Sequence, residues 1–264
     1  MKYKAYVFDI DGTILQNGEA APNMALQNAI NALQQNGAII IIATGRALFS
    51  AKAVLGTIKP DYFISTNGAY ITNKSDKMIF AQYMTSQEMY ALVDFCDDYE
   101  LPLSFTFNDG YYIYTETERY ISEYGDNAEC TEFMRDGTER VRHLIDMPYG
   151  ACLCAKNGKA DEFNAKYAHL ALNLVPFGSN DYYDVFPNSV NKAIGTQKLL
   201  DTLSLNLEDT IAFGDGYNDV ELLRECGYGV AVGSPCSALA DVASEIIKEN
   251  ALALYLCQSL KENI

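Results

Sequence analysis

Two apolar runs near opposite ends of this chain each lead directly into a turn rich in aspartate. Residues 5–8 precede the sequence DIDGT at positions 9–13, and residues 210–213 precede GDGYND at positions 214–219. Apolar runs without polar alternation are typical of strands that are buried on both faces of a parallel sheet. Because the carboxyl ends of parallel strands meet at one edge, we expect both turns to form a single acidic site there.

The sequence around these turns alternates between strand and helix patterns. After the first run, Leu26, Ala29, Ile30 and Leu33 recur at helical spacing. The further predicted elements are strands at 39–43 and 62–64, a helix at 47–55, a helix at 192–203, a strand at 210–213, a helix from 219 and a strand at 229–232. This order predicts an α/β fold with a Rossmann-like parallel sheet that helices cover on both faces.

The middle of the chain has a different pattern. Residues 105–107 and 111–114 flank the sequence Asn-Asp-Gly at 108–110, which predicts an antiparallel hairpin. Helices are predicted at 88–99 and 161–170, and strands at 151–155 and 182–186. We therefore predict that residues 82–184 form an inserted α/β cap domain, and that residues 1–81 and 185–264 form one discontinuous core domain.

Composition restricts the partners of the protein. The 35 acidic and 19 basic side chains give a formal charge of −16, which opposes binding to nucleic acid or to an anionic membrane. The apolar stretch at 38–43 is too short to span a membrane, and the first residues lack a signal-peptide pattern. The seven cysteines have no metal-ligand spacing, and we expect them to be reduced. These features predict a cytoplasmic monomer or weak homodimer that binds neither nucleic acid nor membrane.

The first acidic turn has the residues that covalent catalysis needs. Asp9 ends a buried strand, where a carboxylate is costly unless it serves a metal, a hydrogen-bond network or a reaction. Asp11 follows two residues later, and the turn at Gly12 lets both side chains point into one crevice, one as nucleophile and one as proton donor. Several carboxylates at one point repel each other unless a cation lies among them, which predicts a hard divalent metal. The alternative interpretation is a plain acidic turn.

Three further features each have a chemical and a structural interpretation. Thr44-Gly45-Arg46 follows the second strand, where a hydroxyl and helix-start amides suit a phosphate; the alternative is a threonine helix cap. Lys192 opens a helix near the same sheet edge, where its ammonium would neutralise a phosphoryl oxygen; the alternative is a surface charge. The turn at 214–219 suits a hard cation, although Asp219 also fits a helix cap.

Taken in order, these motifs resemble those of the haloacid dehalogenase-like superfamily. The four matching segments are Asp9-x-Asp11-Gly12-Thr13, Thr44-Gly45-Arg46, Lys192 and residues 214–219. The sequence STNGA at 65–69, together with a cap between the second and third motifs, is similar to the Cof-type sugar-phosphate phosphatases. Two positions depart from the family pattern, because Ala193 replaces the usual glycine and Gly233 precedes Ser234 where asparagine is common. Neither departure removes a reacting group.

The resemblance implies a Mg²⁺-dependent phosphatase that hydrolyses small phosphorylated metabolites, sugar phosphates by default, with the cap selecting the substrate. Asp9 would attack phosphorus and become an aspartyl phosphate, while Asp11 would protonate the leaving alcohol and then activate water. Mg²⁺ would be held by Asp9, Asp215 and the backbone carbonyl of Asp11, with Asp219 as a further ligand or a neighbour of the metal. The groups implied to hold the phosphoryl oxygens are the Ile10 amide, Thr44, the Gly45 amide, Lys192 and Asn218.

Two other functions fit the same residues. A phosphotransferase, such as a phosphomutase, shares the covalent intermediate but passes the phosphoryl group to an acceptor other than water. A noncatalytic phosphoacceptor module also has an aspartate at a strand end, but such modules lack a cap and a late acidic turn.

Overall fold

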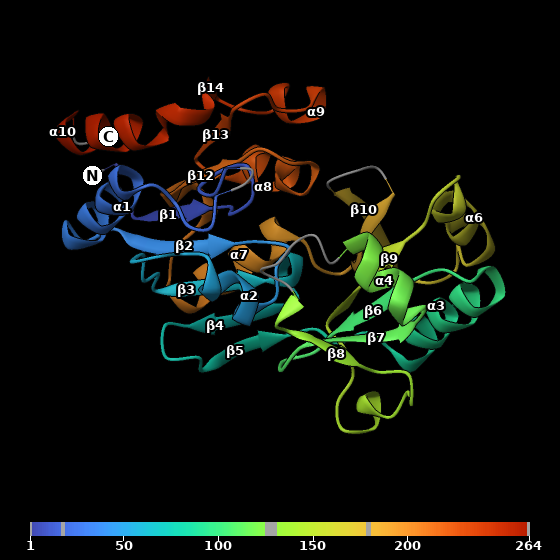
Figure 1. The fold of residues 1–264 in the computed structure, drawn as a ribbon. Helices are drawn as coiled ribbons and strands as arrows, with labels where there is room; N and C mark the ends of the chain where they lie inside the picture. The colour runs from blue at the N-terminus through green and yellow to red at the C-terminus, as the bar shows by residue number, and fades with distance from the viewer. Residues whose placement is uncertain (1, 17–18, 125–130, 178–180, 263–264) are drawn as a thin grey trace. The chain divides into compact units, whose positions relative to one another are not determined.

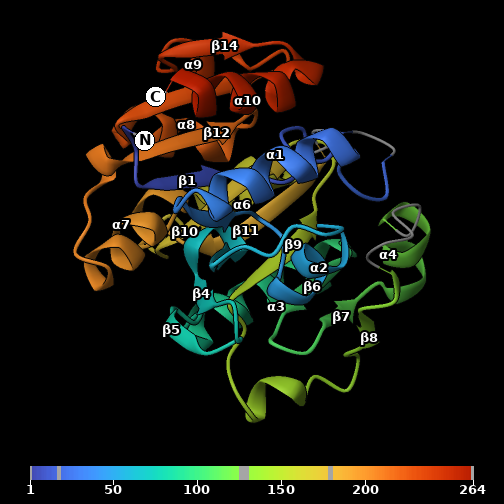
Figure 2. The same ribbon diagram turned by 90° about the vertical axis from the view of Figure 1, so that its left-hand side faces the viewer.

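The computed structural model describes residues 2–16, 19–124, 131–177 and 181–262. The chain divides into two compact units, which are coloured along the sequence in Figures 1 and 2. The core unit comprises Met1–Phe80 and Asn191–Ile264, and the inserted unit comprises Ala81–Val190. Among the described residues, no helix has the length and apolar character needed to cross a membrane.

The core unit is built on one eight-stranded sheet in the order β14-β13-β12-β1-β2-β3-β4-β5. Pairing is parallel from β14 to β3, whereas β3 and β4 are antiparallel. The strands are β1 (Ala5–Phe8), β2 (Ile39–Ala43), β3 (Tyr62–Ser65), β4 (Tyr70–Asn73), β5 (Met78–Ala81), β12 (Thr210–Gly214), β13 (Tyr228–Val232) and β14 (Glu245–Ile247). The predicted parallel α/β core is confirmed, but the extension through β4 and β5 was not predicted.

Side chains of β1 alternate between two hydrophobic clusters on opposite faces of this sheet. Tyr6 and Phe8 pack in the cluster that contains apolar residues of α1 (Met24–Gln35) and α10 (Leu252–Glu262). Ala5 and Val7 pack in the cluster that contains residues of α7 (Lys192–Thr202) and α8 (Val220–Glu225). Burial on both faces explains why the strand has four apolar residues in succession.

Short helical segments connect the remaining core strands. They are α2 (Leu48–Ala53), α9 (Ser237–Ala240), η1 (Thr66–Gly68), η3 (Leu207–Asp209), η4 (Tyr217–Asp219) and η5 (Glu249–Ala251). Asparagine side chains start two of the longer core helices: Asn23 accepts from the Leu26 amide at α1, and Asn191 accepts from the Ile194 amide at α7. These caps satisfy amides that have no partner inside the helix.

The inserted unit contains a six-stranded sheet in the order β10-β11-β9-β6-β7-β8. All described pairings in it are antiparallel except that of β7 with β8. Its strands are β6 (Leu103–Thr106), β7 (Tyr111–Thr115), β8 (Met134–Asp136), β9 (Gly150–Cys154), β10 (Leu172–Phe177) and β11 (Tyr182–Pro187), and its helical segments are α3 (Ser86–Tyr99), α4 (Thr117–Tyr124), η2 (Arg142–Leu144) and α6 (Lys159–Lys166).

The hairpin predicted around residues 108–110 is the β6–β7 pair. Arg142 holds its turn, because the guanidinium donates to the Asn108 and Asp109 side chains and lies 4.4 Å from the centre of the Phe107 ring. The helix predicted at 161–170 ends earlier than expected, because α6 stops at Lys166. Strand β10 was not predicted; it contains Pro176, which suits its position at the edge of the sheet.

Candidate active site

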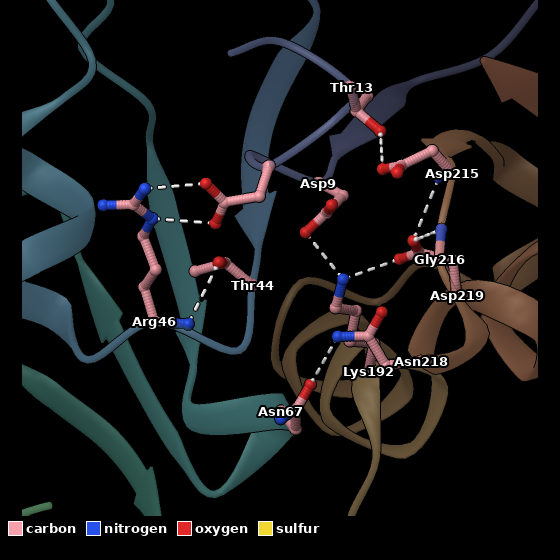
Figure 3. Close-up of polar contacts among 11 residues, drawn as sticks. Asp9, Thr13, Thr44, Arg46, Asn67, Lys192, Asp215, Gly216, Asn218 and Asp219 are labelled. Carbon is pink, nitrogen blue, oxygen red and sulfur yellow. Dashed lines mark hydrogen bonds and ion pairs between the residues drawn. The ribbon is translucent and has the colours of Figure 1, made fainter. Parts of the chain in front are cut away.

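Four neighbouring parallel strands of the core sheet bring the sequence motifs to one edge. Strands β12, β1, β2 and β3 are adjacent in that order, and each ends at a motif residue. Asp215 follows β12, Asp9 follows β1, Thr44 follows β2 and Thr66 follows β3. Figure 3 shows Asp9 between Thr44 on one side and Asp215 on the other.

Asp9 is a buried carboxylate, and its side chain faces an ammonium group. The residue is 5% exposed, and its Oδ1 accepts from the Lys192 Nζ at 2.6 Å. Burial raises the pKa of Asp9 well above its ordinary value, Lys192 opposes this shift, and the neighbouring Asp219 and Asp215 carboxylates add to it. The site therefore disfavours an ionised Asp9 unless further positive charge is present.

Lys192 is fully buried at the first turn of α7. Burial alone lowers the pKa of a lysine, but the Asp219 and Asp9 carboxylates outweigh it, so the pKa of Lys192 is raised and the side chain stays charged. Its Nζ donates to Asp9 at 2.6 Å and to the Asp219 Oδ1 at 2.7 Å (Figure 3). The surface-charge interpretation of this lysine is wrong: its ammonium links the two acidic turns.

The late acidic turn is ordered by its own carboxylates. Asp219 is fully buried, and its Oδ2 accepts from the backbone amides of Gly216 at 3.0 Å and Asp215 at 3.2 Å. The Asp215 Oδ1 accepts from the Thr13 hydroxyl at 3.0 Å, which joins the late turn to the first one. Burial and the Asp219 charge raise the pKa of Asp215 to about 6. Gly12 makes this approach possible, since a Cβ there would lie 2.0 Å from the Asp215 Oδ2 and its φ is +79°.

The donor atoms of Asp9, Asp215 and Asp219 suit a divalent cation. One carboxylate oxygen from each lies within 4.8 Å of the other two. When all three are ionised, these carboxylates exceed the single ammonium of Lys192 by two negative charges. Burial, together with this mutual repulsion, raises the pKa values of Asp9 and Asp215. A hard cation that accepts oxygen ligands relieves this repulsion.

The orientation of the Asp11 side chain differs from the sequence prediction, in which it points into the same crevice as the Asp9 side chain. Its carboxylate forms a two-point ion pair with Arg46, with Nε to Oδ2 at 2.8 Å and Nη2 to Oδ1 at 2.6 Å. The Asp11 side chain is 55% exposed, whereas that of Arg46 is 17% exposed. A carboxylate prefers this planar, two-point partner when one is within reach, so the side chain turns to Arg46. The sequence motif contains Arg46 but does not predict this role, because spacing along the chain does not show that the guanidinium reaches Asp11.

The predicted phosphate-binding residues lie on the same sheet edge. The Thr44 hydroxyl accepts from the Arg46 amide at 3.1 Å, so Gly45 forms the tip of a tight turn. The Ile10 carbonyl accepts from the amides of Thr13, Ile14 and Leu15, which closes the first acidic turn. Asn218 donates from Nδ2 to the Asn67 Oδ1 at 2.9 Å (Figure 3). Asn67 belongs to the STNGA sequence and was not predicted as a site residue.

This arrangement agrees with a comparison against protein families. The model of the haloacid dehalogenase-like hydrolases matches residues 6–252. The chain belongs to the haloacid dehalogenase-like hydrolase family. The family resemblance seen in the motifs is thereby confirmed, and the chain is an enzyme of a hydrolase family.

Individual relatives of this hydrolase agree in sequence and in fold. It is similar to the HMP-PP phosphatase of Cronobacter sakazakii, with 28% identity over 236 residues that cover 86% of this chain and 83% of the relative. It is also similar to the 5-amino-6-(5-phospho-D-ribitylamino)uracil phosphatase of Bacillus subtilis, with 22% identity covering 94% and 88% of the two chains.

Solved structures confirm the fold of this hydrolase over nearly its whole length. A protein from Geobacillus kaustophilus is similar with a TM-score of 0.83 at 25% identity, covering 98% of this chain and 99% of that one. A phosphatase of the HAD superfamily from Bacteroides thetaiotaomicron is similar with a TM-score of 0.84 at 21% identity, covering 98% and 94%. The Rossmann-like core and the inserted α/β unit are thus common to these proteins.

Proposed function

We propose that this hydrolase is a Mg²⁺-dependent phosphomonoesterase of the cytoplasm that acts on small phosphorylated metabolites through an aspartyl phosphate on Asp9. The observation that carries the proposal is the buried Asp9 carboxylate, held by the Lys192 ammonium beside Asp215 and Asp219. Burying a carboxylate costs free energy, and a role as the catalytic nucleophile accounts for that cost. The names of the phosphatase relatives support the same reaction class.

In the first half of the proposed reaction, an oxygen of Asp9 forms a bond to phosphorus and the bond from phosphorus to the leaving oxygen breaks. The carboxyl group of Asp11, protonated and turned from its ion pair with Arg46, gives its proton to that oxygen, so the alcohol leaves neutral. In the second half, Asp11 accepts a proton from water as the water oxygen bonds to phosphorus, and the bond from phosphorus to Asp9 breaks. Inorganic phosphate leaves, and both aspartates return to their starting states.

The donor set fits Mg²⁺, because every candidate ligand is an oxygen and the cluster has excess negative charge. Asp9, Asp215 and the backbone carbonyl of Asp11 would hold the ion, and Asp219 would support it. The two Asp219 oxygens already bind Lys192 and two backbone amides, which favours a role in shaping the turn. When bound, the ion would neutralise charge on the phosphoryl oxygens.

The phosphoryl oxygens would be held by Thr44, Lys192, Asn218 and the amides of Ile10 and Gly45. These groups recognise phosphate alone, so we assign the choice of leaving group to the inserted unit, acting as a cap domain. Sugar phosphates are our default substrate class. The enzyme would act as a monomer or weak homodimer.

The nucleophile assignment is tested with Asp9→Asn and p-nitrophenyl phosphate. The variant should lose at least about 10³-fold in kcat, since an amide cannot form the acyl phosphate. Asp241→Asn is the matched control, because Asp241 is exposed and lies at the end of α9. Hydrolysis by Asp9→Asn at the wild-type rate would refute the proposal.

Sustained release of inorganic phosphate without a sugar bisphosphate would separate the phosphatase from a phosphomutase.

A further inference from the structure

The STNGA sequence forms an unusual turn directly after β3. Thr66, Asn67 and Gly68 all have positive φ, at +49°, +51° and +98°. Residues with a Cβ seldom adopt this left-handed region, and two such residues followed by a glycine make a strained segment. Strain of this kind persists only where the surrounding structure enforces it, and it is concentrated at functional sites.

Contacts with two other site loops hold the turn in place. The Thr66 amide donates to the Arg46 carbonyl and the Asn67 amide donates to the Thr44 carbonyl, both at 2.9 Å. On its other side, a Cβ at Gly68 would lie 2.3 Å from the carbonyl oxygen of Asn191, the residue that caps α7 just before Lys192. The turn therefore fixes the spacing between the loop at residues 44–46 and the start of α7.

The side chain of Asn67 extends this connection to the late acidic turn. Asn67 is 1% exposed, and its Oδ1 accepts from the Asn218 Nδ2 at 2.9 Å (Figure 3). A primary amide carries two N–H donors on its nitrogen and only acceptor sites on its oxygen. When one N–H of Asn218 binds Asn67, the nitrogen end is fixed in place, and its second N–H stays available to an anion.

We propose that Asn67 is a positioning residue, which holds the Asn218 amide so that an N–H, and not the carbonyl oxygen, faces a phosphoryl oxygen of the substrate. This rests on the proposed function, in which Asn218 binds phosphate. Asparagine is suited to the position, since it tolerates the left-handed region better than most residues and supplies an acceptor oxygen. Without this acceptor, the Asn218 amide is free to turn its oxygen toward the phosphate and repel it.

The decisive variant is Asn67→Gly, because glycine adopts φ of +51° without strain and removes only the side chain. KM for p-nitrophenyl phosphate and the inhibition constant of inorganic phosphate should both rise about tenfold, the usual scale for one hydrogen bond to a charged group. The kcat value should change less than about threefold, since a contact made equally in the ground state and the transition state affects KM alone. Asn157→Gly is the matched control: it makes the same substitution at an exposed residue with φ of +58°, and should change neither constant.

A double-mutant cycle with Asn218→Ala separates positioning from a general loosening of the turn. If Asn67 acts through Asn218, adding Asn67→Gly to Asn218→Ala should change KM by less than about twofold. A tenfold KM change that persists in the Asn218→Ala background would overturn the proposal, as would an unchanged KM in Asn67→Gly alone. Should Asn67→Gly unfold, Asn67→Ala removes the same acceptor at the cost of left-handed strain, and its KM is read together with its unfolding midpoint. Asp9→Asn in the same assay tests the proposed phosphatase function separately, because the role of Asp9 as nucleophile does not depend on whether Asn67 positions the Asn218 amide.

Discussion

At the scale of single residues, the ion pair between Asp11 and Arg46 has a consequence for catalysis. The guanidinium fixes both oxygens of a side chain that is otherwise more than half exposed. In the proposed reaction, Asp11 must carry a proton and meet the leaving oxygen, so its side chain has to leave this ion pair before the proton transfer. A leaving group that needs no proton should not depend on this contact.

We therefore expect Arg46→Gln to discriminate between substrates. It should raise kcat/KM by about fivefold for an alkyl phosphate, whose alkoxide is a poor leaving group and needs the proton, because it removes the ion pair that competes with proton transfer. For p-nitrophenyl phosphate, kcat/KM should change by less than about twofold. Lys52→Gln is the control, since Lys52 lies in the last turn of α2 and pairs with Asp76 on the surface. Equal changes on both substrates would show that Arg46 does not act through Asp11.

The sequence predicted the site residues better than their contacts. Asp9, Asp215 and Asp219 were predicted to share one site, and the structure brings their carboxylates together. The orientation of Asp11, the position of Lys192 between two aspartates, and the contact from Asn67 to Asn218 were not predicted. These contacts join residues up to 183 positions apart, and their geometry depends on strand order, which local patterns do not contain.

At the scale of elements, the start of α7 depends on the turn after β3. Gly68 has φ of +98°, and a Cβ there would meet the Asn191 carbonyl. Gly37 has a similar φ of +93°, but a Cβ there would have no neighbouring atom within 4 Å. Both glycines avoid left-handed backbone strain, but only Gly68 also avoids a clash. Substituting each one by alanine therefore separates the free-energy cost of the strain from that of the clash.

Gly37→Ala should lower the free energy of unfolding by about 1 kcal/mol, the usual cost of left-handed strain. Gly68→Ala should lower it by about 2 kcal/mol more, because the new methyl group must displace the cap of α7. It should also reduce activity, since Lys192 follows that cap directly. Denaturant unfolding of both variants gives the comparison, and equal losses would show that the turn and α7 adjust freely to each other.

The elements that the sequence did not predict have identifiable causes. Strands β4 and β5 extend a sheet that is parallel from β14 to β3, and β4 joins it in the antiparallel direction, which the pattern of alternating strand and helix does not indicate. Strand β10 contains Pro176, which a prediction from local pattern treats as a strand breaker. By contrast, the central strands were predicted well, because burial on both faces makes them apolar throughout.

At the scale of the whole molecule, the formal charge of −16 means that any added salt screens repulsion and stabilises the fold somewhat. A specific metal site must be distinguished from this general effect. Only the cluster of Asp9, Asp215 and Asp219 meets the geometric condition for a metal site within the part of the chain that the structure describes. Binding there stabilises the folded state in proportion to the logarithm of metal concentration above its dissociation constant.

We expect about 5 mM MgCl₂ to raise the unfolding midpoint by roughly 5 °C more than NaCl of the same ionic strength, and chelator to reverse the difference. Asp215→Asn should remove the part that is specific to Mg²⁺, because it deletes a charged ligand while leaving the fold and most of the negative charge in place. Asp241→Asn changes the net charge equally, but at an exposed position, and should keep the response. Thermal unfolding of the three proteins in both salts decides the question. If Asp215→Asn responded to Mg²⁺ as the unaltered protein does, the stabilisation would come from screening of the acidic surface, and the ion would have to be assigned to other residues.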